Sequence, residues 1–225
     1  MKVDKEDREQ LIIPSEYYDI IRQTFSIDGR LPSIEWFRKN VSLDVNIDNI
    51  TKIDDHLNLT FVSFNFRHIY TYRSFPILTK EWIKSIADYC QQFNKVYELA
   101  AGGGWITYWL RKYGIDIECI DNYKWKDIKY NDWVKKGDAV EYVKNNQDIE
   151  LFILSWPWMD DMAANIFESM RSGQRILYVG EGYGGCTAND RFFKLVENKK
   201  EETNIEDNFI SFWGIHDYPS VYVKE

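Results

Sequence analysis

Carboxylates and glycines between residues 96 and 122 have the spacing of a turn that binds a nucleotide. Glu98 lies in an apolar run, and Gly102–Gly104 follow it just before a stretch that predicts a helix. Glycines at such a turn let the backbone bend sharply and approach a ligand closely. A second apolar run ends in Asp121, 23 residues after Glu98, close to the ~20-residue offset at which an acid grips a ribose hydroxyl pair. A plain strand-to-helix turn is the alternative.

The class of ligand follows from the charge at position 98. A dinucleotide site places a pyrophosphate at the helix N-terminus and usually has no acid at this position. A carboxylate there repels phosphate but suits a cationic ligand with an amino-acid tail. Gly137-Asp138-Ala139 precede another predicted helix and place a carboxylate where it can accept a hydrogen bond from an adenine amino group. Another nucleotide ligand and an empty pocket stay open as alternatives.

A second candidate site is the tetrad Ser155-Trp156-Pro157-Trp158, at the end of the apolar run 149–155. In open α/β sheets, ligands bind outside the carboxyl ends of the strands, so a substrate is expected here. The alternative is that both tryptophans are packing residues, because the chain has nine of them and most tryptophans are structural.

Three further places carry candidate side chains. Glu181 lies in the glycine-rich stretch 180–187 and could touch a substrate, while His216 precedes Asp217 and could act as a base. Adjacent side chains normally diverge, so a loop histidine with a local hydrogen bond is the alternative. Phe75-Pro76 precede a predicted helix and could line the pocket or simply stiffen the entry to that helix.

Together these residues resemble the seven-stranded Rossmann-like S-adenosylmethionine-dependent methyltransferases, whose first motif reads acid-x-Gly-x-Gly-x-Gly. Ala100 replaces the first of those glycines, and Gly102 and Gly104 keep the other two. The resemblance implies S-adenosylmethionine as the cofactor. It places the methionine moiety at Glu98, Ala100, Gly102 and Gly104, and the ribose at Asp121 and Asn122. It places the adenine at Asp138 and Ala139, and it makes Phe75 and Pro76 part of the pocket wall.

The tetrad resembles the Asp/Asn/Ser-Pro-Pro-aromatic motif of amino methyltransferases. That resemblance implies that Ser155 and the Trp156 carbonyl accept hydrogen bonds from the target amine, that Pro157 holds the turn, and that Trp158 stacks on the planar group. Trp156 stands where that motif has proline. Such acceptors direct the nitrogen lone pair toward the methyl group, so positioning supplies much of the rate.

Residues 155–163, 180–187, 190–193 and 214–217 are also similar to a sparsely characterised group of predicted methyltransferases with Ser-Trp-Pro-Pro-Tyr and Gly-Glu-Gly-x-Gly-Gly-Cys-Thr-Gly motifs. Ala188 stands where that group tends to have glycine. The likeness covers about residues 70 to 224 and supplies no substrate.

The resemblances imply methyl transfer to an amine or amide nitrogen, with a nucleobase amino group in DNA or RNA as one candidate. We expect a direct in-line displacement with no covalent enzyme intermediate and no metal. The alternatives are a non-catalytic subunit with this fold that serves a partner enzyme, a small-molecule methyltransferase, and a nicotinamide- or nucleotide-dependent enzyme.

Residues 123–136 raise the possibility of a nucleic-acid substrate. They hold five lysines against two aspartates, a net +3, with Tyr123, Trp125, Tyr130 and Trp133 between them. Basic residues interleaved with aromatics suit single-stranded or splayed nucleic acid. A solvated lysine face whose aromatics tuck inward is the alternative. The formal net charge of −8 argues against unspecific duplex binding, which depends on phosphate neutralisation.

The elements that must position these residues predict an α/β protein with a Rossmann-like, mostly parallel seven-stranded sheet, helices on both faces and an N-terminal α+β extension. We expect the extension over residues 1–74 and the methyltransferase core over 75–225. The extension should hold a charged lead-in at 1–10, two helical pieces within 14–40, a weak strand or loop at 41–55, and a strand pair or bent strand at 56–69. In the core, strands are expected at 95–100, 115–120, 149–155, 175–179, 209–213 and 220–224, and an antiparallel edge is one arrangement open to the last two. Helices are expected at 79–93, 105–113, 139–145, 163–171 and 188–198.

Composition excludes several other classes. Hydrophobic residues make up 44% and charged residues 28% of the 225-residue chain, which excludes a disordered protein. The absence of an apolar run of ~18 residues argues against a membrane span, and the charged start MKVDKEDREQ argues against a signal peptide. Three cysteines without a CxxC pair suggest reduced thiols and a cytoplasmic location. Three scattered histidines make a zinc site unexpected. The 16% aromatic content makes a homo- or hetero-oligomeric interface plausible.

Overall fold

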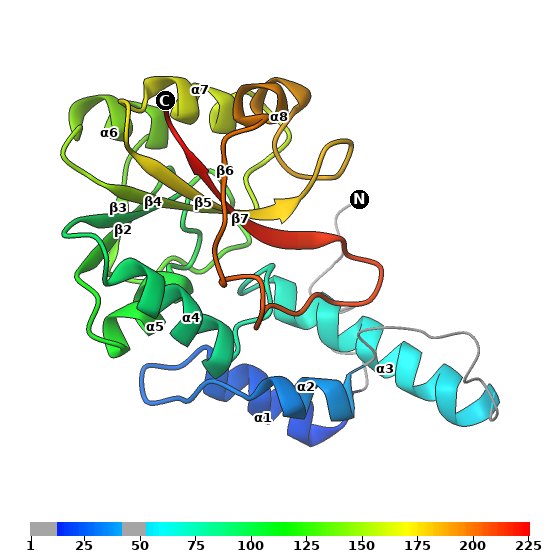
Figure 1. The fold of residues 1–225 in the computed structure, drawn as a ribbon. Coiled ribbons are helices and arrows are strands. Elements are labelled where there is room, and N and C mark those ends of the chain that lie inside the picture. Colours follow the sequence, from blue (N-terminus) through cyan, green and yellow to red (C-terminus); the bar gives the residue numbers. More distant parts are fainter. Residues whose placement is uncertain (1–12, 42–52) are drawn as a thin grey trace.

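A computed structural model describes residues 13–41 and 53–225 (Figure 1). The predicted lead-in at 1–10 and most of the predicted strand or loop at 41–55 lie outside the described residues. No described helix has both the length and the apolar composition that a membrane crossing requires.

Seven strands form one sheet in the order β3-β2-β1-β4-β5-β7-β6. Their bounds are β1 Val96–Leu99, β2 Ile117–Asp121, β3 Val134–Lys136, β4 Leu151–Ser155, β5 Arg175–Glu181, β6 Lys200–Glu201 and β7 Asp217–Val223. Strands β1 to β5 run parallel, whereas β7 is antiparallel to both of its neighbours, β5 and β6. The predicted mostly parallel, seven-stranded α/β sheet is therefore confirmed. The strand order reverses between β1 and β4, which is the point where open sheets of this kind bind ligands.

Helices cover both faces of the sheet (Figure 1). Helices α6 Ala139–Asn145, α7 Met162–Ser169 and α8 Asp190–Val196 lie on one face, and α4 Lys80–Cys90 and α5 Trp105–Lys112 lie on the other. Side chains of one strand alternate between the two apolar cores: Leu151 and Ile153 join the core with α4 and α5, and Phe152 and Leu154 the core with α6 to α8. Because both faces are buried, β4 is apolar without interruption.

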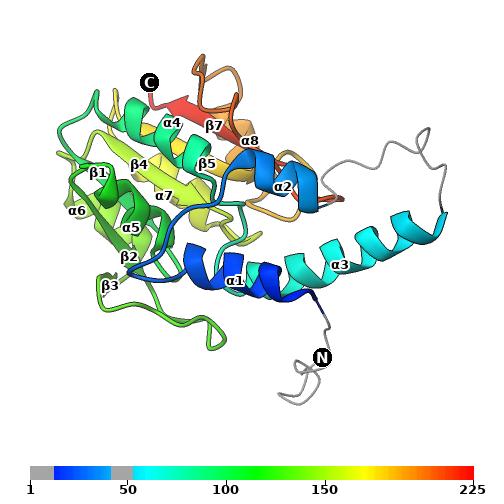
Figure 2. The same ribbon diagram turned by 90° about the horizontal axis from the view of Figure 1, so that it is seen from below.

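Three further helices, α1 Ser15–Thr24, α2 Ile34–Asn40 and α3 Ile53–Thr71, lie outside the α4 and α5 layer (Figures 1 and 2). They surround a third apolar core that includes Phe37, Phe66 and Tyr70. The Trp109 indole Nε1 on α5 donates to the Thr24 carbonyl at 3.0 Å and ties α1 to this layer. The two helical pieces predicted within 14–40 are thus confirmed.

Two predicted strand regions are wrong. Residues 56–69 belong to helix α3. The prediction failed because apolar residues recur in this segment without a clear helical period, so the sequence matches a period of two as well; Phe66 and Tyr70, four residues apart, share the third core. Residues 209–213 form no strand, although Phe209 and Phe212 pack against apolar cores. The short strands β3 and β6 were not predicted.

The helix starts that depend on side-chain caps agree with the sequence. The Thr79 hydroxyl accepts a hydrogen bond from the Trp82 N–H at 3.2 Å, which starts α4 where it was predicted. Helix α6 spans the predicted residues and begins after Asp138. All three cysteines lie within the described residues and are free thiols, with Cys90 and Cys119 buried and Cys186 exposed.

Candidate functional site

A cavity of about 540 Å³ opens at the carboxyl ends of the parallel strands. Its walls come from the segment between α3 and α4, the glycine-rich turn after β1, the segments after β2 and β4, and the loop after β5. It brings together many of the residues singled out in the sequence: Glu98, Ala100, Gly102, Asp121, Asn122, Phe75, Pro76, Ser155, Trp156, Pro157 and Trp158. These residues meet because β1, β2 and β4 are neighbours in the sheet.

Asp121 fixes the glycine-rich turn against the next loop. Its Oδ2 accepts a hydrogen bond from the Gly102 N–H at 2.9 Å, and its Oδ1 accepts one from the Tyr123 N–H at 2.8 Å. The residue is 8% exposed and lines the cavity. A carboxylate offers about four lone-pair sites, so Asp121 keeps acceptor capacity for a ligand.

Two glycines of the glycine-rich turn have positive φ angles, a backbone conformation that favours glycine. Gly102 and Gly104 have φ angles of +54° and +71°. A Cβ atom at Gly104 would lie 2.6 Å from Val134 Cγ2, so this position excludes any side chain. Gly104 itself does not line the cavity; it precedes α5 as the residue at its N-terminus.

Ala100 adopts φ +49°, a left-handed conformation that favours glycine. It stands where the resembled motif has glycine, and its Cβ atom makes this backbone conformation strained. Ala188 behaves in the same way, with φ +51° at a position where the similar group tends to have glycine.

We expect Ala100→Gly to raise the free energy of unfolding by about 0.5–1 kcal/mol, because glycine adopts positive φ without the Cβ penalty. Urea denaturation of both proteins measures the change. Ala101→Gly is the matched control, since Ala101 has no positive φ; it should lower stability slightly. Equal changes in the two variants would show that φ at position 100 carries no strain.

Glu98 is a buried carboxylate on the cavity wall, only 2% exposed. Its Oε2 accepts hydrogen bonds from the Thr107 N–H at 3.0 Å and the Thr107 hydroxyl at 2.6 Å. Burial raises the pKa of Glu98 to about 7, partly offset by these hydrogen bonds and reinforced by the charge of Asp121. Glu98 is therefore close to half ionised at neutral pH in the protein without a ligand.

The turn after β4 has an unusual backbone at Trp156, with φ +50°. The Trp156 N–H donates to the Val179 carbonyl on β5 at 2.7 Å. Its indole stacks on Phe75 at 4.7 Å between ring centroids, and its Nε1 donates to Asp217 Oδ2 at 2.9 Å. Proline cannot adopt a positive φ and has no N–H. The tetrad therefore differs in backbone geometry from the motif that has proline at this position.

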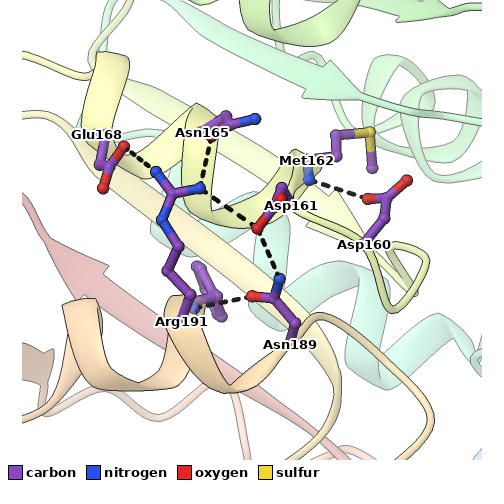
Figure 3. A network of polar contacts seen from close by, with 8 residues as sticks. Asp160, Asp161, Met162, Asn165, Glu168, Asn189 and Arg191 are labelled. Atoms are coloured by element: carbon purple, nitrogen blue, oxygen red, sulfur yellow. Dashed lines mark hydrogen bonds and ion pairs between the residues drawn. The ribbon is translucent and has the colours of Figure 1, made fainter.

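Trp158 lies at the cavity mouth and is 60% exposed. Its ring meets that of Trp125, from the segment after β2, edge to face at 5.3 Å. The segment that carries Trp158 ends in a polar network with α7 and α8 (Figure 3). Asp161 Oδ1 accepts from Asn189 Nδ2 at 3.0 Å and pairs with Arg191 at 3.3 Å, and Arg191 also pairs with Glu168. The network anchors this segment to two helices.

Five predicted site residues do not line the cavity: Gly104, Asp138, Ala139, Glu181 and His216. The Asp138 carboxylate caps α6, accepting from the N–H groups of Val140 and Glu141 at 2.9 and 3.0 Å. Ala139 is the first residue of that helix and is buried.

Glu181 and His216 lie outside the cavity lining, and the contact between them joins the Glu181 carboxylate to the His216 backbone N–H. Glu181 accepts hydrogen bonds from the N–H groups of Cys186 at 2.7 Å and His216 at 3.2 Å. Although burial acts to raise the pKa of Glu181, these donors hold it below its ordinary value. Asp217 is bonded to Trp156, and burial raises the pKa of Asp217.

Sequence reasoning missed Thr107 and Cys186 as site residues. It singled out Trp125 only for a nucleic-acid face, and it considered Asp217 only beside His216. Thr107 holds Glu98, and Asp217 holds Trp156; Trp125 and Cys186 line the cavity. A hydroxyl early in the helix after the turn and the aromatic residue beside Lys124 were visible signals, whereas the pairing of Asp217 with Trp156 was not. Among the described residues, no group of three or more histidine, cysteine, aspartate or glutamate side chains is placed to hold a metal ion.

Comparisons with known proteins give structural likenesses only. No protein-family model matches the sequence, and no curated protein matches it. A SAM dependent methyltransferase from Archaeoglobus fulgidus is 17% identical, with 64% of this chain and 92% of that chain covered and a TM-score of 0.43. A TehB-like SAM-dependent methyltransferase from Corynebacterium glutamicum is 18% identical, with 64% and 87% covered and a TM-score of 0.43. Human N-acetylserotonin methyltransferase is 12% identical, with 93% and 66% covered and a TM-score of 0.40.

Proposed function

We propose that this chain is an S-adenosylmethionine-dependent methyltransferase that acts on an amine or amide nitrogen. The observation that carries the proposal is the placement of Glu98 and Asp121. They lie near the carboxyl ends of two paired strands, β1 and β2, on one cavity and beside a glycine-rich turn, and β1 also borders the point where the strand order reverses. This is where sheets of this type bind nucleotides.

The residues on the cavity fit such a cofactor. Two carboxylates suit a cationic amino-acid moiety and a pair of ribose hydroxyls, and they disfavour a pyrophosphate. The volume of about 540 Å³ lies within the range of roughly 300–1,000 Å³ for small-molecule sites. When bound, S-adenosylmethionine supplies an electrophilic methyl group on a sulfonium. Glu98 would hold its amino group and Asp121 its ribose.

The acceptor would enter from the side of Ser155 and Trp158. Both lie on the same cavity as Glu98, so a nitrogen held there faces the cofactor region. The Ser155 hydroxyl and the Trp156 carbonyl would accept hydrogen bonds from the amine, and Trp158 would cover its planar group. These acceptors orient the nitrogen lone pair and hold it in place, and neither forms a covalent bond with the substrate.

The N-terminal extension, residues 1–74 in this proposal, would close one side of this site. Thr71–Ser74 at the end of α3, with Phe75 and Pro76 after them, line the cavity. Phe75 also stacks on Trp156. The extension would therefore contribute Thr71–Ser74 to the site, and Phe75, the first residue after it, would stiffen the turn after β4.

Because Glu98 ionises near neutral pH, both the stability of the protein and its affinity for a cationic ligand should depend on pH. Because the pKa of Glu98 in the folded protein is about 7, above the ordinary value, the folded state holds more protons between about pH 4.5 and 7. Its stability therefore falls as pH rises through that window. A cationic ligand favours the ionised form, so its affinity should rise severalfold between about pH 6 and pH 7.5.

Calorimetric titration with S-adenosylmethionine at several pH values measures this rise. Glu98→Gln keeps an acceptor for Thr107 but removes the charge, so it should bind weakly and without that dependence. An unchanged pH profile in Glu98→Gln would show that another group controls binding.

The proposed function itself is tested by titrating the wild-type protein with S-adenosylmethionine and S-adenosylhomocysteine. We expect micromolar binding of both, followed by transfer from labelled methyl donor to amine-containing acceptors. Binding of NAD(P) or ATP analogues instead would favour a nucleotide-dependent enzyme. Cofactor binding without turnover on any acceptor, with co-purification of a homologous chain, would favour a non-catalytic subunit.

A further inference from the structure

The loop between β2 and β3, residues 122–133, carries three lysines that have no ion-pair partner among the described residues. Lys124, Lys126 and Lys129 are exposed, and within the described part of the chain none of them forms an ion pair. By contrast, Lys135 on β3 pairs with Glu118 at 2.6 Å. Lys124 lines the cavity, and so does Arg73, an exposed residue across it that also lacks an ion pair among the described residues. The loop also holds Asp127 and Asp132, so its net charge is +1 on a chain of net charge −8.

The aromatic residues of this loop divide into two groups. Tyr123 and Tyr130 stack on each other at 4.0 Å, and the Tyr130 hydroxyl bonds the backbone N–H and carbonyl of Trp125 at 3.2 and 3.1 Å. Trp133 packs against the apolar core. Only Trp125 points outward, at 48% exposed. The tyrosines thus brace a backbone that presents one tryptophan at the cavity mouth.

Trp125 continues the exposed aromatic surface of Trp158. The two rings meet at 5.3 Å with an angle of 67° between their planes, and both line the cavity. Exposing two tryptophans costs free energy that burial would return. Two aromatic faces beside exposed lysines suit a ligand that alternates flat rings with negative charges.

We propose that this rim, formed by Lys124, Trp125, Lys126, Lys129 and Trp158, binds single-stranded nucleic acid and delivers one base into the cavity. The lysines neutralise phosphates, and the tryptophans stack on bases next to the one that enters. A base inside a duplex cannot reach a cavity behind such a rim without leaving its stack, and a chain of net charge −8 disfavours unspecific duplex binding. This inference rests on the proposed function, because it names the acceptor of the same site.

The test measures binding of the full chain to fluorescein-labelled oligothymidine and oligouridine of about 20 nucleotides, by fluorescence anisotropy. We expect micromolar affinity for at least one of the two strands, and a preference between them would identify the sugar. Between about 50 and 200 mM KCl the slope of log K against log salt should be about −2, as three neutralised phosphates require on a single strand.

Two variants and one matched control locate the contact. The triple variant Lys124→Gln, Lys126→Gln, Lys129→Gln should bind at least ~tenfold more weakly at low salt, with a slope near zero. Trp125→Ala should weaken binding at least ~fivefold without changing the slope. The control Lys39→Gln, Lys112→Gln, Lys194→Gln removes the same charge from exposed sites on α2, α5 and α8 and should change affinity by less than about twofold. Circular-dichroism melts should show all variants folded, because the replaced side chains are exposed.

Several results would overturn the inference: no strand binding by the wild type at about 100 µM, equal losses in the rim and control triples, equal affinity for a duplex of the same sequence, or equal affinity for a mononucleotide. Titration of the same preparation with S-adenosylmethionine separates the two proposals. Cofactor binding without strand binding leaves the methyltransferase proposal standing and removes the nucleic-acid surface. Binding of single-stranded nucleic acid without cofactor binding leaves the nucleic-acid surface standing and removes the methyltransferase proposal.

Discussion

Asp121→Ala is expected to weaken S-adenosylmethionine binding at least ~tenfold, which corresponds to a loss of ~1.4 kcal/mol. The carboxylate is the proposed acceptor for the ribose hydroxyls, and it also holds the N–H groups of Gly102 and Tyr123. Removing it deprives a ligand of its partner and leaves both N–H groups without an acceptor. The free energy of unfolding should therefore fall by about 1–3 kcal/mol as well. Calorimetric titration and urea denaturation measure the two effects.

Two controls separate binding from folding in this experiment. Glu118→Ala changes an exposed carboxylate on the same strand and should leave affinity unchanged. Asp121→Asn keeps one acceptor oxygen and should lose less stability than Asp121→Ala while still binding poorly. If Asp121→Ala lost stability but bound the cofactor as tightly as the wild type, Asp121 would be a structural residue of the turn and not a ligand residue.

Trp156→Pro should lower the free energy of unfolding by at least ~3 kcal/mol. The resembled amino-methyltransferase motif has proline at this position, so a comparison of motifs alone predicts that the substitution is harmless. The structure predicts the opposite. Its φ of +50° is outside the range of proline, and the N–H that proline lacks donates to the Val179 carbonyl at 2.7 Å.

Trp156→Ala is the matched control, because it removes the same indole and its contacts with Phe75 and Asp217 while keeping the backbone N–H. The difference between the proline and alanine variants isolates the backbone and should be at least ~2 kcal/mol in urea denaturation. Equal stability of the two variants would show that the turn adopts the backbone of the motif after all.

Much of the sheet could be predicted because buried parallel strands leave a plain signal. Strands β1, β2, β4 and β5 are near-continuous apolar runs, and the helices between them begin at residues such as Thr79 and Asp138 whose side chains cap a helix. Strands β3 and β6 span three and two residues. Segments that short exist as strands only because a neighbour supplies their hydrogen bonds, so their own residues carry little signal.

Helix α3 shows where pattern reading fails. Its apolar residues recur in the sequence without a clear helical period, and Phe66 and Tyr70 from its last part pack in the third core. An alternating pattern was therefore equally compatible with the sequence. Tertiary packing decided between the two.

The candidate site also has features that the sequence could predict and features that it could not. Glu98 and Asp121 could be placed together because Asp121 ends β2, Glu98 lies one residue before the end of β1, and the two strands are adjacent. The hydrogen bond between Asp217 and the Trp156 indole could not, because it depends on β7 lying beside β5 and on the positive φ of Trp156. The outward face of Trp125 depends on the brace from Tyr130, which sequence spacing does not reveal.

The place of β7 also constrains the order in which the chain can fold. This strand follows β1 to β6 in the sequence, yet it lies between β5 and β6 and pairs with β5 over seven residues. Until it is synthesised and inserted, β5 has an unpaired edge that another chain can join, and β6 has no partner. Insertion requires contacts between distant segments, which form slowly. Because Asp217 arrives with β7, the nascent chain acquires the partner of Trp156 only at this last step, so the cavity wall matures after the rest of the sheet.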